Sequence, residues 1–381
     1  GVSTRVLMVS DVYFPRVNGV STSIETFRRA LVPEQVSVRL VAPRYGHEPE
    51  EADVIRIGAR QVPRDPEDRL LPWSETRATV LRAAADADLV HIQTPFVAHY
   101  AGLKAARTLG KPVLATYHTF FEEYLYHYAP FLPSGGLKAL ARRFSRTQCN
   151  ALDAVIVPST AMRDRLAEYG VTVPMHVLPT GIPLDRFAAG DRARFRRERG
   201  LGERPVLLFV GRVAHEKNIG FLLDVVARVK RRVPELCFLI TGEGPATPAL
   251  KRKTEALGLG DAVRFIGYLD RQTDLPDAYA AADVFIFASR TETQGLVLLE
   301  AMAMGVPVVA LAAMGTRDIL APRRGCLAPP DDVAGFAEAL GGLLDDPDTL
   351  ALLSNEARAY AREWADDRMA ARLAALYRRL V

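Results

Sequence analysis

Residues 283–310, which read DVFIFASRTETQGLVLLEAMAMGVPVVA, decide the fold. An apolar run at 283–289 is followed by a polar loop, by a helical stretch that opens near Gly295, and by a second apolar run at 306–312. Both runs are continuous rather than alternating, and strands that are buried on both faces of a parallel sheet read in this way. The segment therefore predicts a strand–helix–strand unit of an α/β protein.

The same rhythm extends outward over the whole chain. Segments with apolar residues at helical spacing separate the runs, and 179–183 forms a turn-rich linker. We expect two doubly wound, Rossmann-like α/β domains that face each other across a cleft, because ligands bind at the carboxyl ends of parallel strands. The further expected strands are 5–10, 36–43, 54–59, 88–93, 112–118, 154–159, 175–181, 205–212, 236–242, 263–269 and 325–328.

Composition excludes several classes of protein. The 381 residues are 49% hydrophobic and 25% charged, which is typical of a soluble chain of about two domains. The longest apolar run, nine residues from Val306 to Met314, is too short for a membrane helix. The balance of 49 Lys and Arg against 45 Asp and Glu argues against nucleic acid as a partner. Three distant cysteines and a strand pattern that begins at Arg5 predict a cytoplasmic protein without a signal peptide.

Two glutamates flank the helix start in the 283–310 segment. Glu292 lies in the loop at a strand's carboxyl end, and Glu300 follows eight residues later. Backbone N–H groups at a helix start favour a phosphate, and a carboxylate accepts hydrogen bonds from a vicinal diol. The pattern indicates either a sugar-nucleotide site or two surface acids that the helix dipole favours. The candidate phosphate-binding amides are those of Gly295, Leu296 and Val297.

Two cations, Arg212 and Lys217, lie near the carboxyl end of the expected strand at 205–212. Cations that converge on a pyrophosphate form charge-assisted hydrogen bonds and would stabilise a departing nucleoside diphosphate. The alternative is a solvated pair at a helix start, but the helix dipole disfavours cations there. This second motif therefore favours a diphosphate site.

Several single residues at strand ends are weaker candidates. His118 can bond a sugar hydroxyl or transfer a proton, although a lone histidine is more often structural. Gly19 would let backbone approach a phosphate closely. The turns at Gly242 and at Tyr268–Leu269 either border a base or are only turns.

Together these residues resemble family 4 of the retaining glycosyltransferases, whose fold is the two-domain GT-B architecture. The resemblance spans nearly the whole chain and rests on VGR at 210–212, EKN at 216–218, TGEGP at 241–245 and TETQGLVLLEAM at 291–302. It implies an acceptor-binding domain at 1–183, a nucleotide-sugar-binding domain at 184–360, and a terminal helix at 361–381 that packs back on the first domain.

The resemblance also implies a role for each matching residue. Arg212 and Lys217 would hold the donor pyrophosphate, Glu300 the ribose diol, and Glu292 the sugar hydroxyls together with the amides at 295–297. The implied enzyme is a hexosyltransferase that retains the anomeric configuration, with the leaving phosphate helping to deprotonate the acceptor. His118 would contact the donor sugar, Gly19 a phosphate, and Tyr268 and Leu269 the base. Gly242 also belongs to the implied donor-binding residues. The implied catalytic residues are His118, Glu292, Arg212 and Lys217.

Two features resemble the branch of the family that glycosylates diacylglycerol and related lipids: HTFFEEY at 118–124 and ETQ at 292–294. Independently, apolar residues at 137, 140, 141 and 144 repeat at helical spacing beside a basic stripe. Such a helix either lies on an anionic membrane or packs its apolar side into a domain core. The candidate membrane and acceptor residues are Tyr124, Tyr126, Lys138, Arg142, Arg143 and Arg146.

We therefore expect transfer from UDP-glucose to a lipid such as diacylglycerol, by a protein peripheral on the cytoplasmic membrane face. UDP-glucuronate, UDP-galactose or GDP-mannose as donor, a soluble or polysaccharide acceptor, a nucleotide-sugar epimerase and a non-catalytic binder are the alternatives. A nicotinamide enzyme is disfavoured because no G-x-G-x-x-G follows the first strand. We expect no cofactor and no required divalent metal, since the acidic triplet at 86–88 enters a buried strand. The oligomeric state stays open.

Overall fold

A computed structural model describes residues 3–381 apart from 64, 129–130 and 132, and the side chains of 66 and 126–128 also lie outside the described part. The chain divides into unit 1 (Gly1–Gly181 and Asp366–Val381) and unit 2 (Ile182–Ala365). The expected boundaries after residues 183 and 360 lie two and five residues from these divisions. Ile182 belongs with unit 2 because its N–H donates to the Trp364 carbonyl at 2.8 Å and it forms a parallel bridge with Ala365.

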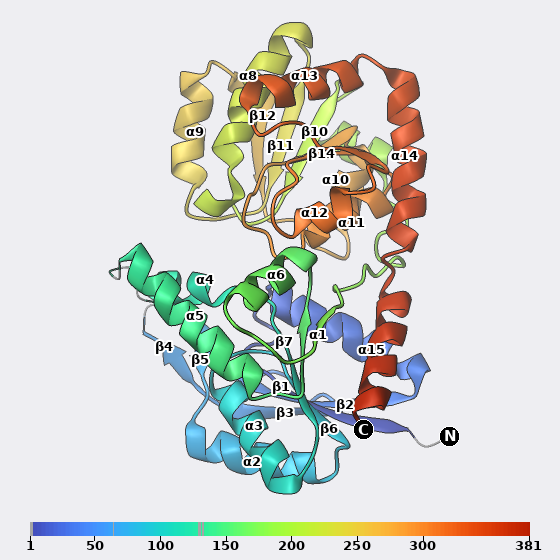
Figure 1. Ribbon diagram of the computed structural model, residues 1–381. Helices are drawn as coiled ribbons and strands as arrows, with labels where there is room; N and C mark the ends of the chain where they lie inside the picture. The colour runs from blue at the N-terminus through green and yellow to red at the C-terminus, as the bar shows by residue number, and fades with distance from the viewer. Residues whose placement is uncertain (1–2, 64, 129–130, 132) are drawn as a thin grey trace. The chain divides into compact units, whose positions relative to one another are not determined.

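Unit 1 is built on a parallel seven-stranded sheet in the order β3-β2-β1-β6-β7-β8-β9 (Figure 1). Each strand coincides with an apolar run that the sequence predicts. The strands are β1 (Thr4–Val9), β2 (Val36–Arg44), β3 (Val54–Gly58), β6 (Leu89–Ile92), β7 (Val113–Thr116), β8 (Ala154–Val157) and β9 (Met175–Val177). The helices are α1 (Gly19–Ala30), α2 (Trp73–Ala85), α3 (Val97–Leu109), α4 (Phe121–Tyr128), α5 (Ser134–Asn150), α6 (Thr160–Glu168) and α15 (Asp366–Leu380), with a short 3-10 turn η1 (Val32–Glu34).

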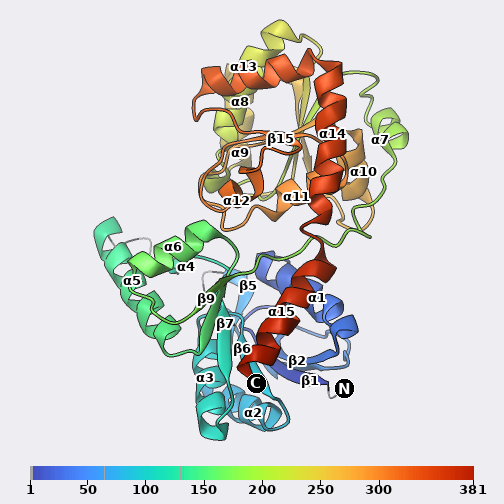
Figure 2. The ribbon, with the colours of Figure 1, turned by 45° about the vertical axis from the view of Figure 1, so that its right-hand side comes forward.

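The two faces of this sheet are covered by different helices. Val90 and Ile92 point toward Gly102 of α3, where a Cβ would meet Ile92 at 2.8 Å. Successive strand residues face opposite sides, so His91 points away from α3, and its Nδ1 lies 2.6 Å from the hydroxyl of Tyr377 in α15. Figure 2 shows α15 beside α1 on that opposite face. The C-terminal helix is therefore part of the unit 1 core.

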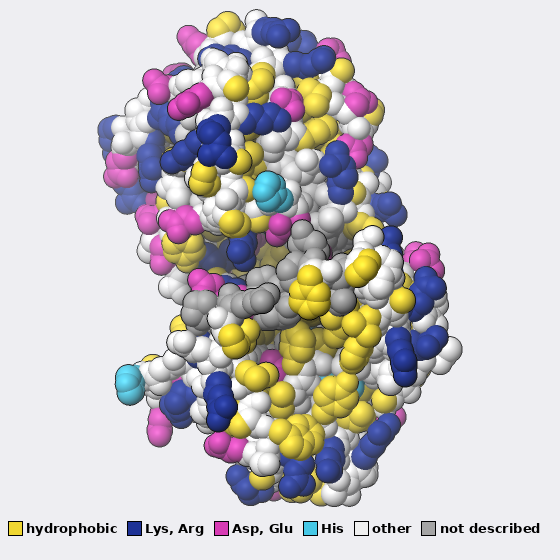
Figure 3. Space-filling view, turned by 90° about the vertical axis from the view of Figure 1, so that its left-hand side faces the viewer, with side chains coloured by type: hydrophobic (Ala, Val, Ile, Leu, Met, Phe, Trp, Pro, Cys, Tyr) yellow, Lys and Arg dark blue, Asp and Glu magenta, His cyan; other side chains and the backbone are white. Residues whose placement is uncertain are grey.

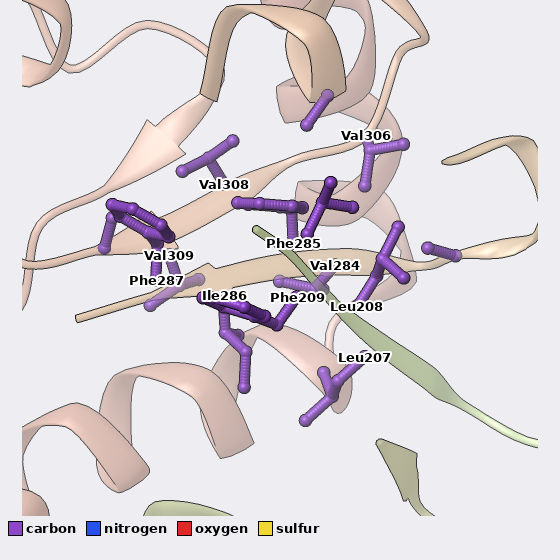
Figure 4. Packing of buried hydrophobic residues seen from close by; sticks show 14 of the residues in the cluster. Leu207, Leu208, Phe209, Val284, Phe285, Ile286, Phe287, Val306, Val308 and Val309 are labelled. Atoms are coloured by element: carbon purple, nitrogen blue, oxygen red, sulfur yellow. The ribbon is translucent and has the colours of Figure 1, made fainter. Parts of the chain in front are cut away.

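Unit 2 has a parallel six-stranded sheet in the order β12-β11-β10-β13-β14-β15. Its central strands are buried on both faces, and the rings of Phe209 and Phe287 stack with centroids 5.9 Å apart (Figure 4). The strands are β10 (Val206–Val210), β11 (Cys237–Thr241), β12 (Val263–Gly267), β13 (Val284–Phe287), β14 (Val308–Ala310) and β15 (Cys326–Leu327). The helices are α7 (Arg192–Glu198), α8 (Ile219–Arg232), α9 (Thr247–Ala256), α10 (Asp274–Ala281), α11 (Leu296–Ala303), α12 (Thr316–Leu320), α13 (Val333–Leu344) and α14 (Pro347–Arg362), with 3-10 turns η2 (His215–Lys217) and η3 (Gly260–Ala262).

These two Rossmann-like parallel sheets confirm the predicted α/β class. One element was not predicted, an antiparallel hairpin of β4 (Arg60–Val62) and β5 (Asp65–Leu70). Its strands are short and polar, so they carry neither a continuous nor an alternating apolar pattern.

Candidate active site

The strands that change the direction of the unit 2 sheet order are β10 and β13, which are neighbours in the sheet although β11 and β12 lie between them in sequence. Ligands of open α/β sheets bind outside the carboxyl ends of the strands at such a switch point. The loops at these ends are residues 211–218 and 288–295, which carry Lys217 and Glu292. The topology therefore brings together the two motifs that the sequence analysis singled out.

Lys217 and Glu292 form an ion pair although they are 75 residues apart in sequence. The Lys217 Nζ donates to Glu292 Oε1 at 2.8 Å and to Oε2 at 3.0 Å. The side chains are 20% and 17% exposed, so the pair is largely covered but still open to a ligand. An acid and a cation held at a switch point can contact a sugar hydroxyl and a phosphate, respectively.

Hydrogen bonds from neighbouring residues tie the two loops together. The Asn218 side-chain amide donates to the Ala288 carbonyl at 2.9 Å, and the Ser289 hydroxyl donates to the Glu216 carbonyl at 3.2 Å. The backbone of Asn218 itself adopts the left-handed conformation, with φ 57°. These hydrogen bonds hold the two loops together and so keep Lys217 and Glu292 within contact distance of each other.

The start of α11 leaves its first amides open. Gly295 adopts φ 85°, and a Cβ there would come within 2.9 Å of Thr316, so both conformation and packing require glycine. The Leu298 N–H donates to the Gly295 carbonyl at 3.0 Å. Within the described part of the chain, no acceptor is found for the N–H groups of Gly295, Leu296 and Val297. Together with the helix dipole, these groups offer an anion site beside Glu292.

Glu300 lies deeper, in α11, and is only 3% exposed. Its Oε1 accepts a hydrogen bond from the Tyr279 hydroxyl at 2.8 Å, and its Oε2 pairs with the Arg271 guanidinium. The nearby Glu300 charge raises the pKa of Arg271. Burial, with a smaller contribution from Glu300, raises the pKa of Tyr279 well above its usual value. Both partners therefore act as hydrogen-bond donors to the carboxylate.

The other predicted donor residues of unit 2 occupy the same sheet edge with different exposure. Arg212 is exposed, and Tyr268 is 59% exposed, whereas Leu269 is buried. Gly242 has φ 116°, and a Cβ there would lie 1.8 Å from the Gly211 carbonyl oxygen. Close backbone packing therefore accounts for this glycine, and its predicted contact with the donor stays a prediction.

In unit 1, His118 follows β7 and bonds Gln93, which follows β6. The His118 Nε2 lies 2.8 Å from Gln93 Oε1, and the neutral tautomer that fits this contact has its proton on Nε2 and an acceptor at Nδ1. Burial lowers the pKa of His118 to about 4. The imidazole is therefore neutral near pH 7 and suited to accept a hydrogen bond from a hydroxyl.

A buried carboxyl group, Asp11, lies at the end of β1 in the same unit. It accepts hydrogen bonds from the Thr94 hydroxyl at 2.6 Å and from the Ala98 N–H at 3.2 Å, which ties β1 to the start of α3. Burial raises the pKa of Asp11 to about 6. Gly19 is exposed at the start of α1, where a Cβ would meet nothing within 4 Å, and Asn18 caps the Ser21 N–H at 2.9 Å. Packing does not require this glycine, and its phosphate contact stays a prediction.

The candidate membrane surface of unit 1 combines an aromatic cluster with basic side chains. The ring of Tyr124 packs on Phe96, and Phe121 stacks on Phe144, with centroids 4.9 and 5.0 Å apart. Figure 3 shows hydrophobic side chains gathered on this face of unit 1, with Lys and Arg nearby. The side chain of Tyr126 lies outside the described residues. The basic candidates Lys138, Arg142, Arg143 and Arg146 are all exposed.

The apolar stripe of α5 packs into unit 1. Leu137 and Ala141 are buried, and Phe144, the most exposed of the stripe, is 36% exposed. The alternative in which this side of the helix belongs to the domain core is therefore correct for most of the stripe. The exposed basic row and part of Phe144 remain accessible to a membrane.

No metal cluster is found among the described residues, where no three His, Cys, Asp or Glu side chains gather to hold an ion. Asp88 of the acidic triplet instead accepts a hydrogen bond from the Arg5 N–H at 2.8 Å and joins two strand ends. The helices of the described chain likewise include none whose length and apolar character would suffice to span a bilayer.

Comparison with known proteins decides the family. A model described as Glycosyltransferase Family 4 matches residues 17–186, and one described as Glycosyl transferases group 1 matches 204–346. Alpha-monoglucosyldiacylglycerol synthase of Streptococcus pneumoniae is 33% identical over 80% of this chain and 70% of that protein. The chain belongs to glycosyltransferase family 4. It is therefore an enzyme, a hexosyltransferase, as predicted.

Two further comparisons of this family 4 enzyme concern a second relative and a solved structure of the same fold. A GDP-mannose-dependent alpha-(1-6)-phosphatidylinositol monomannoside mannosyltransferase of Mycolicibacterium smegmatis is 31% identical, with 97% of each chain covered. The crystal structure of Anabaena HepE in complex with UDP superposes with a TM-score of 0.78 at 18% identity, covering 99% of this chain and 100% of that one. The structural likeness confirms the GT-B type of fold.

Sequence reasoning missed the residues that orient the candidate site of this glycosyltransferase. Arg271 and Tyr279 hold Glu300, and Gln93 holds His118. A partial signal exists, because Arg271 and Gln93 each lie within four residues of a strand's carboxyl end. The hydroxyl of Tyr279 has no such signal, since it sits in a helix whose apolar pattern indicates only the core.

Proposed function

We propose that this enzyme transfers a glucosyl group from UDP-glucose to a lipid acceptor such as diacylglycerol, with retention of the anomeric configuration. The observation that carries the proposal is the Lys217–Glu292 pair beside the open amides of Gly295–Val297 at the β10–β13 switch point. A cation and helix-start amides suit a diphosphate, and the adjacent carboxylate suits a sugar. The UDP complex of HepE, which has the same fold, supports a nucleoside diphosphate here.

The chemistry asked of these residues is electrostatic. The bond between the anomeric carbon and the diphosphate oxygen breaks, the acceptor oxygen bonds the same face of that carbon, and the leaving phosphate takes the acceptor proton. Lys217, Arg212 and the α11 amides would stabilise the charge that grows on the diphosphate. Glu292 would hold sugar hydroxyls and stabilise positive charge at the anomeric carbon. These roles need no metal, so we propose that the enzyme is independent of divalent ions.

The lipid acceptor and a peripheral position at the cytoplasmic membrane face rest on two supports. The synthase of Streptococcus pneumoniae is named for a glucosyldiacylglycerol product, and the mannosyltransferase for a phosphatidylinositol acceptor. The exposed basic residues of α5 would attract anionic headgroups, each by about 1 kcal/mol. The second relative also favours a second candidate, GDP-mannose as donor with a phosphatidylinositol lipid as acceptor.

One experiment tests the proposal. The protein is incubated with UDP-glucose, UDP-galactose, UDP-glucuronate or GDP-mannose and with anionic vesicles that contain diacylglycerol or a phosphatidylinositol lipid, and products are identified by mass. We expect a glucosyl-diacylglycerol from UDP-glucose, and its formation should be much slower with the Glu292→Gln variant. A mannosylated phosphatidylinositol would establish the second candidate. Interconversion of the sugar nucleotide without any acceptor would instead identify an epimerase.

A further inference from the structure

The carboxylate of Glu300 is bonded to two other side chains of the protein, Tyr279 and Arg271. Its carboxylate is almost fully covered, and each of its oxygens already has one donor from the protein. An ionised carboxyl group has about four acceptor positions on its two oxygens. With two occupied, two remain for the paired hydroxyls of a ribose.

The two partners of Glu300 come from different elements and differ in how tightly the protein packs around them. Tyr279 of α10 is 0% exposed, and its ring packs against Phe187 and Phe285 with centroids 6.0 and 6.1 Å apart. Arg271 comes from the loop after β12, and its guanidinium lies 6.0 Å over the ring of Phe187. Its side chain is 35% exposed. The tyrosine is thus fixed by the core, whereas the arginine reaches the surface of the site.

These contacts determine which way the carboxylate faces. A buried charge needs a counter-charge, and Arg271 is the cation that contacts Glu300. One donor on each oxygen also stops the carboxylate from rotating about its last bond. Without Arg271, Oε2 would have no fixed direction, and the carboxylate could turn or retreat from the ligand.

We propose that Arg271 is a positioning residue that makes the site selective for ribonucleotides over 2′-deoxyribonucleotides. It presents the free acceptor positions of Glu300 to the two ribose hydroxyls without itself touching the donor. This inference rests on the proposed function and on the role that the family resemblance implies for Glu300, which is to bind the ribose diol. It adds a residue that acts on selectivity rather than on overall affinity.

The test compares UDP with dUDP, and GDP with dGDP, by titration calorimetry. We expect the wild type to bind the ribose form of its preferred diphosphate at least about tenfold more tightly, because the deoxy form leaves a buried carboxylate position unpaired. Arg271→Met should reduce this ratio to about threefold or less. Arg271→Lys, which keeps a cation, should restore part of the ratio, and Tyr279→Phe should lower it. As a control, Arg232→Met removes an arginine that pairs with Asp345 at 2.6 Å at the far end of α8, and should leave the ratio unchanged.

The outcomes separate the inference from the proposed function. If Arg271→Met weakens both forms equally and the ratio stays as in the wild type, Arg271 contacts the diphosphate directly and the inference is wrong. A wild type that binds the ribose and deoxy forms equally removes the ribose from Glu300 and overturns the inference, whereas the proposed function, which rests on Lys217 and Glu292, still stands. A wild type that binds neither UDP nor GDP refutes the proposed function and the inference with it. Melting curves check that each variant folds, and if Arg271→Met does not, the Lys and Phe variants decide.

Discussion

Replacing Lys217 and Glu292 separately should change binding of the nucleoside diphosphate in opposite directions. The Lys217 Nζ lies 2.8 and 3.0 Å from the two Glu292 oxygens, and about four fifths of each side chain is covered. Hydrogen bonds to charged groups contribute about 1.5–3 kcal/mol in such settings. Lys217→Ala should therefore weaken UDP binding by about 10- to 100-fold, at about 1.4 kcal/mol per factor of ten.

Glu292→Gln should instead tighten UDP binding by about two- to fivefold, since it removes an anion that competes with the diphosphate for Lys217. The same variant should bind UDP-glucose no better than UDP, because the sugar loses its charged partner, and its turnover should fall more than its donor affinity. Titration calorimetry with UDP and UDP-glucose, followed by transfer kinetics, measures all of these quantities. The double variant should show non-additive effects, because the two residues are in direct contact.

A matched control is available in the same unit. Lys253 donates to Asp224 at 2.9 Å, between α9 and α8, and Lys253→Ala should leave UDP binding unchanged. If both Lys217→Ala and Glu292→Gln weakened UDP binding to the same extent, the pair would be a structural bridge between two loops. Unchanged UDP binding in Lys217→Ala would remove this lysine from the donor site altogether.

Three further predictions concern the membrane, the metal and pH. Reversing Arg142 and Arg146 to Glu should lower binding to anionic vesicles at least about tenfold while UDP binding stays constant, and equal vesicle binding would make the helix an ordinary solvated surface. Transfer should proceed at an unchanged rate in excess chelator; loss of all transfer after complete removal of Mg²⁺ would contradict the metal-independent scheme. Burial lowers the pKa of His91 to about 3 and the pKa values of His99 and His118 to about 4, so below pH 6.5 the unfolded chain binds protons that the folded chain does not. The free energy of unfolding should therefore fall by about 2 kcal/mol per histidine from pH 7 to pH 5. Asp11, whose pKa is raised to about 6, opposes this fall by about 1.4 kcal/mol. Urea titrations that coincide at the two pH values would contradict the prediction.

The sheets and their edges were predictable because strands that are buried on both faces have continuous apolar sequences. β10 and β13 consist of residues that are all buried, and their continuous apolar runs identify them without any contact information. Once both are parallel strands of one sheet, the loops that follow them must share an edge. Lys217 and Glu292 could thus be assigned to one site, but their direct ion pair could not, because it depends on how two irregular loops are tied by Asn218 and Ser289.

Helical periodicity shows that a segment is a helix but not what covers it. The stripe on α5 predicted the helix correctly, yet whether Leu137 and Ala141 meet a membrane or the core depends on residues distant in sequence. The C-terminal segment shows the same limit. Its continuous pattern at 348–381 hides the break at Glu363–Ala365, where the Trp364 carbonyl accepts from Ile182 and the chain leaves unit 2.

The two units present different chemistry at equivalent edges. In unit 1 the groups after β6 and β7 are neutral: Gln93 is an amide, and burial keeps His118 uncharged near pH 7. In unit 2 the loops after β10, β12 and β13 carry Lys217, Arg271 and Glu292, and Glu300 lies in α11. A diphosphate needs cations, whereas hydroxyl groups can bond either to neutral partners or to carboxylates such as Glu292 and Glu300. Under the proposed function, we therefore expect unit 2 to bind the diphosphate of the donor, and the His118–Gln93 pair of unit 1 to contact hydroxyl groups.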